Sequence, residues 1–206
     1  MNYNIAHFQG FPIYHSKTNY FLENKEKQYL SSLKYFTEEP SNNVRYITEN
    51  SNIFQSSQLS NLKKLFNKHL KIYLEEVLQI KNQLKLTQSW ITINKPNHKH
   101  RPHYHRNCFL SVVYYPQIKS GSLYFSSDRC MLQQGYDFVF DNIKDNMYNT
   151  FEMCFNPIPS SLLIFPGWIM HGTTKNESNV DRIMIGASYF LKGTLGKDEN
   201  YNKLVL

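Results

Sequence analysis

The sequence predicts a mainly β fold with flanking α-helices, and three observations predict it. A block with helical periodicity occupies the N-terminal part of the 206-residue chain, and short apolar runs of β type follow it. Proline or glycine separates most of these runs. Aromatic residues make up 15% of the chain, and aromatic side chains pack well on pleated sheets. Several short strands after a helical block indicate a sandwich or barrel that helices brace.

The N-terminal part, residues 1–86, is expected to form a helical support. Residues 8–15 look like a short extended entry strand, and a first helix is expected over 24–36, where Asn24 can act as the N-cap. Residues 57–81 predict a clearer helix, because their apolar residues recur at helical spacing. This stripe comprises Leu59, Leu62, Phe66, Leu70, Tyr73, Val77 and Ile80. We expect the helix to pack across the outside of a sheet.

Residues 87–195 are expected to form the β core. The first strand, 90–94, alternates in polarity and ends at a Lys-Pro turn. The later expected strands are 108–115, 122–125, 161–165 and 182–191. The stretch 126–158 has only weak β character, and a connection of that length is usually functional, so we predict a lid or insert there. We expect one domain that spans residues 1–206.

The composition narrows the class of function. The formal net charge of +7 and the pI of about 9.2 attract polyanions. The lysines, however, lie mainly on solvated helix faces and form no arginine-rich stripe with interleaved aromatics, so nucleic acid is a disfavoured partner. The three cysteines form no CxxC pair, which argues against a zinc knuckle or a disulfide framework. No signal pattern and no apolar run of about 18 residues occurs, so we expect a cytoplasmic protein without a membrane partner.

Histidines carry the strongest chemical signal. Four of the eight lie within eight residues, at positions 98, 100, 103 and 105, and His171 follows strand 161–165 and a Pro-Gly turn. On a strand, residues i and i+2 point to the same face. His103 and His105 can therefore aim two imidazoles at one metal ion. His171 could complete a facial set that leaves positions open for oxygen and substrate.

Spacing alone does not choose between the two histidine pairs. His98 and His100 lie among lysine and arginine residues just after a turn, where an exposed loop is expected. His103 and His105 lead directly into the expected strand 108–115. We therefore predict the second pair as ligands. The alternative is a solvated histidine-rich loop that binds no metal.

Arg182 opens an otherwise apolar run, eleven residues after His171. A buried arginine is costly unless it meets an anion, and its planar fork suits a carboxylate. The alternative is a salt bridge at the rim, for which Asp181 or Glu177 could serve. Taken without its neighbours, Arg182 fits the rim salt bridge better.

In their order along the chain, these motifs resemble a family of 2-oxoglutarate/Fe(II)-dependent oxygenases that is widespread in phages and marine bacteria. The matching segments are 90–94, 102–105, 111–115, 121–125, 166–171 and 182–183. The resemblance covers nearly the whole chain and is most specific over 90–190. It implies a double-stranded β-helix core (jelly-roll, cupin-like) with N-terminal helices packed outside. For a phage-encoded member, it implies the host cytoplasm as the compartment.

The resemblance also implies roles for individual residues. His103, His105 and His171 would bind Fe(II), and Arg182 would grip the distal carboxylate of 2-oxoglutarate. Two inward-facing helpers would assist it, Asn94 and Tyr115.

This sequence departs from the wider superfamily in two respects. Most members have Asp or Glu where His105 stands, so three neutral imidazoles leave the iron site one unit more positive. Val112 and Met184 stand where smaller residues are usual, and both are expected to narrow the pocket.

The expected function is a dioxygenase, and specifically a hydroxylase, that couples decarboxylation of 2-oxoglutarate by O2 to oxidation of a small-molecule or peptidyl substrate. One alternative is a cupin-like three-histidine dioxygenase that works without 2-oxoglutarate, although Arg106 and its neighbours replace the glutamate of a cupin motif. The other is a non-catalytic jelly-roll binding module. Neither the substrate nor the oligomeric state has a readable code in the sequence.

Overall fold

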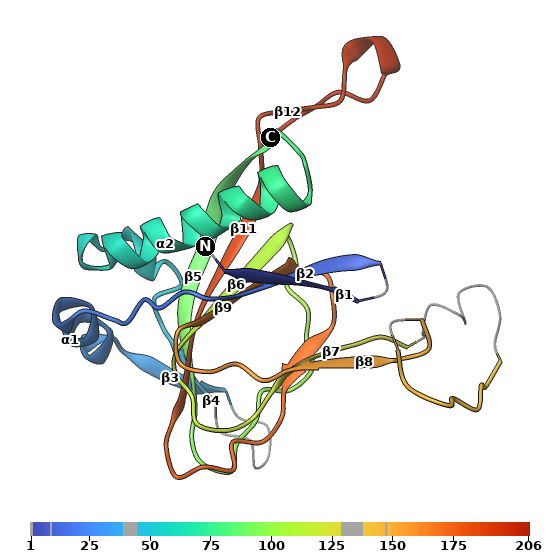
Figure 1. Ribbon diagram of the computed structural model, residues 1–206. Coiled ribbons are helices and arrows are strands. Elements are labelled where there is room, and N and C mark those ends of the chain that lie inside the picture. Colours follow the sequence, from blue (N-terminus) through green and yellow to red (C-terminus); the bar gives the residue numbers. More distant parts are fainter. Residues whose placement is uncertain (1, 9, 39–44, 129–137, 147) are drawn as a thin grey trace.

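Two antiparallel sheets and two α-helices form most of the computed structural model (Figure 1), which describes residues 2–8, 10–38, 45–128, 138–146 and 148–206. The large sheet contains, in spatial order, β1 (Tyr3–Phe8), β2 (Phe11–Lys17), β9 (Ser161–Pro166), β6 (Leu110–Gln117), β11 (Arg182–Lys192), β5 (Gln83–Asn94), β4 (Arg45–Thr48) and β3 (Tyr35–Glu38). The small sheet contains β10 (His171–Thr173), β7 (Leu123–Ser126) and β8 (Glu152–Phe155). A C-terminal hairpin pairs β12 (Thr194–Leu195) with β13 (Leu204–Val205) around a 3-10 turn, Asp198–Asn200.

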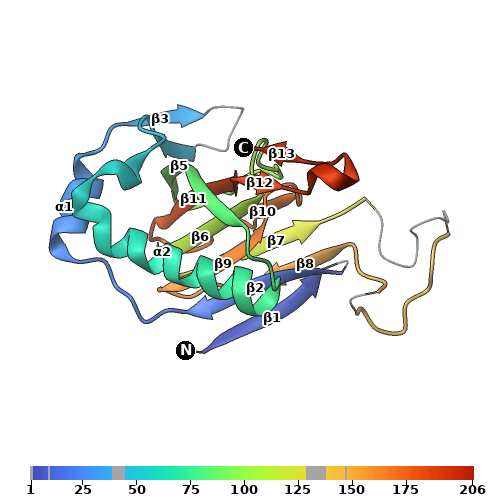
Figure 2. The ribbon, with the colours of Figure 1, turned by 90° about the horizontal axis from the view of Figure 1, so that it is seen from above.

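The helices cover one face of the large sheet, and the small sheet covers the other (Figures 1 and 2). Helix α1 spans Asn24–Ser32, and α2 spans Ser60–Ile72. Two 3-10 turns, Ile53–Gln55 and Ser57–Leu59, lead into α2, and a π-helical turn, Tyr73–Val77, continues it. The expectation of a mainly β fold with helices packed outside is confirmed.

Successive side chains of the central strands point alternately into two hydrophobic cores, one under the helices and one between the two sheets. Ile185 and Ala187 of β11 face the helices and pack with the apolar stripe of α2. Met184, the residue before Ile185, faces the small sheet and packs with Phe125 and Phe165. Because successive strand residues point to opposite faces, every second residue of β5, β6 and β11 reaches the space between the sheets.

The N-terminal part is more than a helical support. Its strands β1 and β2 extend the large sheet beyond β9, and β3 and β4 extend it beyond β5. The expected helix 24–36 ends at Ser32, because Leu33 turns to an extended conformation and Phe36 joins β3. The short strand β4 lies in a polar stretch that has no period-2 apolar pattern, so the sequence alone did not indicate it.

The expected lid or insert, 126–158, contains β8, and its residues 138–146 and 148–151 are described without regular structure. Residues 129–137 of this stretch lie outside the described part, and its role as a lid stays a prediction. None of the helices in the described residues is both long and apolar enough to cross a bilayer.

Candidate metal centre

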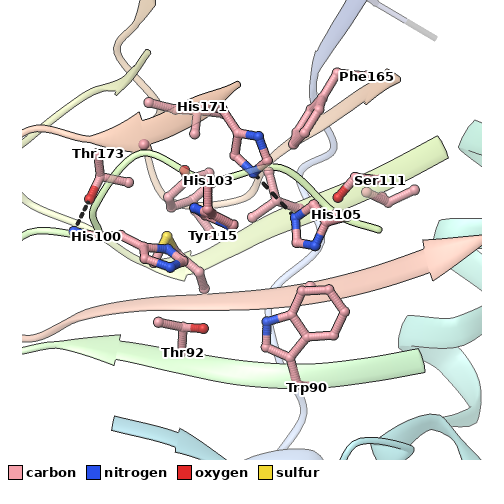
Figure 3. Close-up of a pocket in the computed structure, with 16 residues that line it drawn as sticks. Trp90, Thr92, His100, His103, His105, Ser111, Tyr115, Phe165, His171 and Thr173 are labelled. Carbon is pink, nitrogen blue, oxygen red and sulfur yellow. Dashed lines mark hydrogen bonds between the residues drawn. The ribbon is translucent and has the colours of Figure 1, made fainter. Parts of the chain in front are cut away.

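The structure brings together the three histidines that the sequence proposed as ligands. One ring nitrogen from each of His103, His105 and His171 lies within 4.8 Å of the others. The Nε2 atoms of His105 and His171 are 3.2 Å apart, and the ring centroids of His103 and His171 are 4.3 Å apart. Figure 3 shows the labelled rings gathered at one end of a pocket. Three imidazoles in this arrangement can share one divalent transition metal.

Backbone pairing positions these rings. His171 begins β10 and pairs with Phe125 of β7. His103 forms an isolated bridge with His171, in which each backbone N–H donates to the other residue's carbonyl at 2.9 Å. The N–H of His105 donates to the carbonyl of Gly167 at 2.7 Å. The His-x-His segment is therefore a loop held against β10 and its preceding turn, and not the regular strand that the i, i+2 argument assumed.

Hydrogen bonds to backbone carbonyls orient two of the rings. Nδ1 of His103 lies 3.0 Å from the carbonyl oxygen of Arg101, and Nδ1 of His171 lies 2.8 Å from that of Ile169. Each Nδ1 then carries the proton, which leaves the lone pair on Nε2. Burial lowers the pKa of His171 well below its usual value, and the adjacent His103 and His105 lower it further. His171 therefore presents a neutral imidazole, the form that binds a metal.

A small cavity of about 40 Å³ adjoins the histidines between the two sheets. The indole of Trp90 forms part of its wall, 5.4 Å from the ring of His105. Gly186 makes this position available, because a Cβ there would lie 2.7 Å from the indole carbons. Ser111 and Phe165 also line the cavity.

His100 is a cavity residue that the sequence reasoning assigned to an exposed loop. Its ring stacks on His103 with a centroid distance of 4.0 Å, and it lines the cavity. Its backbone is paired with Thr173 of β10: His100 N–H donates to Thr173 Oγ1 at 2.8 Å, and Thr173 N–H donates to the His100 carbonyl at 3.0 Å. No local sequence signal distinguishes His100 from His98, because the pairing partner is more than 70 positions away.

Arg182 is buried, with 1% of its surface exposed. Its Nη1 donates to the carbonyl of Thr174 at 3.0 Å, and its Nη2 donates to Thr173 Oγ1 at 2.7 Å and to Asn94 Oδ1 at 3.3 Å. Asp181, a candidate for a rim salt bridge, instead pairs with Lys95 at 2.7 Å. Within the described residues no carboxylate forms an ion pair with Arg182. The alternative that Arg182 forms a salt bridge at the rim is therefore wrong.

Three donor groups around Arg182 have no acceptor in the described part of the chain. They are the Nε of Arg182 itself, the Nδ2 of Asn94 and the hydroxyl of Tyr115, all fully buried. Asn94 lies opposite Arg182 in the β5–β11 register. Burial raises the pKa of Tyr115, so its hydroxyl keeps its proton. Buried donors without acceptors are rare, and an anion at this point would satisfy them.

The two expected narrowing residues behave differently. Met184 faces the space between the sheets and lines the cavity. The side chain of Val112 packs in the helix-side core, because it lies one residue out of phase with Ser111, Val113 and Tyr115. Val112 nevertheless also contributes to the lining of the cavity, so the expectation that it narrows the pocket stays a prediction.

Comparisons with known proteins agree with this arrangement. Residues 88–187 match the family described as "Putative 2OG-Fe(II) oxygenase". No curated protein matches the chain.

Solved structures share the fold. A 2OG-Fe(II) oxygenase family oxidoreductase from Burkholderia pseudomallei has a TM-score of 0.55 and 10% identity, over 80% of this chain and 75% of that one. HygX from Streptomyces hygroscopicus, with nickel and 2-oxoglutarate bound, has a TM-score of 0.57 and 13% identity, over 86% and 82%. A prolyl-4-hydroxylase from Pseudomonas putida has a TM-score of 0.51 and 13% identity, over 78% and 79%. At such identities the likeness shows the fold alone.

Proposed function

We propose that this chain, whose residues 88–187 match the 2OG-Fe(II) oxygenase family, is an Fe(II)- and 2-oxoglutarate-dependent dioxygenase that hydroxylates its substrate. The substrate is a small molecule or a peptidyl group, and the proposed compartment is the cytoplasm, or the host cytoplasm for a phage-encoded protein. The proposal treats residues 1–206 as one oxygenase domain.

One observation carries the proposal. A buried guanidinium, which has no carboxylate partner among the described residues, lies close to a three-histidine cluster, because Arg182 donates a hydrogen bond to Thr173, two residues after His171. An uncompensated buried cation is costly, and the cost is offset when an anionic ligand binds. A dicarboxylic acid that reaches from this cation to a metal would satisfy both features at once.

The residues divide the work of binding between them. One ring nitrogen from each of His103, His105 and His171 would hold the metal. Arg182 would bind the distal carboxylate of 2-oxoglutarate, with Asn94 and Tyr115 as the neighbouring donors.

Bound Fe(II) and 2-oxoglutarate supply the oxidising chemistry, in which O2 and 2-oxoglutarate give succinate, CO2 and one oxygen atom for the substrate. The chain orients these groups and excludes water. Phe165 packs 4.7 Å from the ring of His171, between centroids, and Trp90 covers the side of His105. An apolar wall of this kind protects a reactive centre from solvent.

The charge balance supports a dianionic cosubstrate. Three neutral imidazoles leave a divalent ion with its full charge of two, and Arg182 adds one positive charge nearby. 2-Oxoglutarate carries two negative charges, which compensate much of this excess. A cupin-like dioxygenase that works without 2-oxoglutarate gives no role to the buried Arg182, and a non-catalytic module gives none to the converging lone pairs.

Anaerobic titration of the untagged protein tests the proposal. Fe(II) followed by 2-oxoglutarate should produce a visible charge-transfer absorption that saturates at one equivalent per chain, and admission of O2 should release succinate. Metal binding without this absorption would favour the cupin-like alternative. A chain that holds no stoichiometric metal would favour the binding module.

A further inference from the structure

A second cavity, of about 420 Å³, lies beside the turn that joins β9 to β10. The ends of β1, β2 and β7 form the rest of its wall, and Figure 2 shows β1 and β7 ending on the same side of the molecule. None of its described lining residues also lines the cavity at the three histidines. This second cavity is therefore a separate site, and the roles assigned above do not use it.

Two aromatic side chains form one wall of the second cavity. Trp168, in the β9–β10 turn, is 55% exposed, and Phe11, at the start of β2, is 38% exposed. Their rings meet edge to face, with centroids 4.6 Å apart and an angle of 87° between the planes. This contact holds the indole in place although much of it faces solvent. Exposed apolar surface of this kind commonly marks a binding site.

A carboxylate lies on the same wall. Asp128 is exposed, and it is the only charged residue among the described lining residues of the second cavity. It forms no ion pair within the described part of the chain. The face of an indole ring attracts a cation, and a carboxylate forms charge-assisted hydrogen bonds with an ammonium or guanidinium group. Together these two groups suit an organic cation.

The stretch that contains Asp128 is acidic, although the whole chain carries a net charge of +7. Between residues 126 and 158 the acidic residues outnumber the basic ones and give a net charge of −3. The acidic residues are Asp128, Asp137, Asp141, Asp145 and Glu152, and the basic residues are Arg129 and Lys144. A local charge opposite to that of the chain attracts cations and repels anions. The charge around the second cavity therefore favours the same class of ligand as its wall.

The turn that carries Trp168 also contacts two of the three clustered histidines. The carbonyl oxygen of Gly167 accepts the backbone N–H of His105 at 2.7 Å, and that of Ile169 lies 2.8 Å from Nδ1 of His171. A ligand held against Trp168 is thus held next to the candidate metal centre. A site in this position can anchor one end of a substrate while another part of it enters the metal cavity.

We propose that the second cavity binds an alkylammonium or alkylguanidinium group of the substrate, between the indole of Trp168 and the carboxylate of Asp128. The inference rests on the proposed function and names the chemical class of its substrate. A lysyl or arginyl side chain and a free aliphatic amine share this chemistry. A neutral or anionic chain of the same length lacks the charge that both groups recognise.

The test is an NMR titration of the full-length chain, with Zn(II) added as a diamagnetic ion. The chain has two tryptophans, so it gives two indole N–H signals, and the signal that is missing from Trp168→Leu identifies Trp168. The probes are a capped alanine-lysine-alanine tripeptide, the same tripeptide with norleucine in place of lysine, and n-pentylamine. We expect the lysyl tripeptide to shift the Trp168 signal and to bind at least about five-fold more tightly than the norleucine tripeptide.

Variants locate the binding energy, with affinity measured from the signals of the probe. We expect Trp168→Leu to weaken the lysyl tripeptide about five-fold, and Trp168→Phe, which keeps an aromatic face, to weaken it less than about three-fold. Asp128→Asn should weaken it about two- to three-fold at low salt, and less at high salt. Phe21→Leu is the matched control, because Phe21 is 63% exposed and lies outside this cavity. Thermal unfolding of each variant checks that it is folded.

The free amine identifies the source of the cation. Equal affinity of n-pentylamine and the lysyl tripeptide supports a free amine as the substrate, and weaker binding of n-pentylamine supports a peptidyl one. Equal binding of the lysyl and norleucine tripeptides, or unchanged affinity in folded Trp168→Leu, overturns the inference and leaves the proposed function standing. A chain that binds the lysyl tripeptide at Trp168 but fails the charge-transfer titration overturns the proposed function and leaves the cation site standing.

Discussion

The Nε2 atoms of His105 and His171 lie 3.2 Å apart although 66 positions separate the two residues in the chain. Nδ1–H of His171 donates a hydrogen bond to the carbonyl oxygen of Ile169. The lone pair of this ring is therefore on Nε2, which faces His105. Two ring nitrogens at this distance are joined either by a hydrogen bond, in which a neutral His105 donates from Nε2–H, or by a metal ion that both nitrogens bind. The folded chain therefore prepares the metal site before any ion arrives.

Removing one of these rings should strongly weaken metal binding. We expect His171→Ala to weaken Fe(II) binding by roughly two orders of magnitude or more, because even partners outside the ligand set change metal affinity about 10- to 100-fold. His98→Ala is the matched control, since His98 lies in the same loop system but outside the cluster. The measurement is the amount of metal bound per chain, from elemental analysis of each untagged variant. Equal losses in both variants would contradict the assignment.

Arg182→Met should separate cosubstrate binding from metal binding. The methionine fills similar space but leaves the distal carboxylate without its cation, so we expect the affinity for 2-oxoglutarate to fall at least about 100-fold. Fe(II) affinity should change by less than about three-fold, because Arg182 contacts none of the three histidines in the described hydrogen bonds.

The stability of the same variant provides the control. In wild type, 2-oxoglutarate with Fe(II) should raise the unfolding temperature by mass action, and in Arg182→Met it should not. A variant that fails to fold would show that the guanidinium is chiefly structural, through its bonds to Thr174 and Asn94.

Much of the site could be predicted from the sequence because its signals are local. His103 and His105 come directly before an apolar strand, and His171 follows a Pro-Gly turn, so both segments place histidines next to the core. An arginine at the start of an apolar strand indicates a buried charge. The ordered motifs of the family resemblance tied these local signals together. The same period-2 argument, applied to Val112, would have placed its side chain in the helix-side core.

The rest depends on contacts between distant segments. His100 enters the cavity because β10 pairs with it through Thr173, and a single sequence does not show this pairing. Strand β4 forms because β5 offers it an edge, and β3 in turn pairs with β4, although their own residues lack alternation. Tertiary pairing decides these elements, and local propensity does not.

Gly186 should be intolerant of a side chain. A Cβ at this position would lie 2.7 Å from the indole of Trp90, so Gly186→Ala has to displace a ring that packs beside His105. We expect the variant to lose about 1 to 3 kcal/mol of unfolding free energy, as overpacked sites do. Chemical denaturation measures the loss.

A double-mutant cycle identifies the cause. Trp90→Leu removes the indole, so Gly186→Ala in that background should lower the unfolding free energy by less than about 0.5 kcal/mol. The difference from its effect in wild type is the interaction energy between the two positions. Additive effects of the two changes would mean that strand flexibility at Gly186, and not the indole contact, explains the loss.

Acid should destabilise the protein partly through His69, which lies in α2 beneath the sheet. Its Nδ1 is 2.6 Å from the hydroxyl of Tyr14, and both residues are buried. Burial first, and the charge of Lys68 second, lower the pKa of His69 from 6.5 to about 4. Between these two pH values His69 is protonated in the unfolded chain and neutral in the folded chain. The free energy of unfolding is therefore highest above about pH 6.5 and falls as the pH drops toward 4.

His69→Gln keeps a partner for Tyr14 and does not titrate. From about pH 7 to about pH 5, we expect wild type to lose about 2 kcal/mol more unfolding free energy than this variant, measured by urea denaturation of the metal-free protein. Metal-free protein is used for both chains, so that acid release of an ion from the histidine cluster contributes to neither curve. His171 and His15 also titrate with lowered pKa values, but they are present in both chains and cancel in the difference. Parallel curves for the two chains would mean that His69 accepts its proton without unfolding, and that the contact with Tyr14 does not hold it neutral.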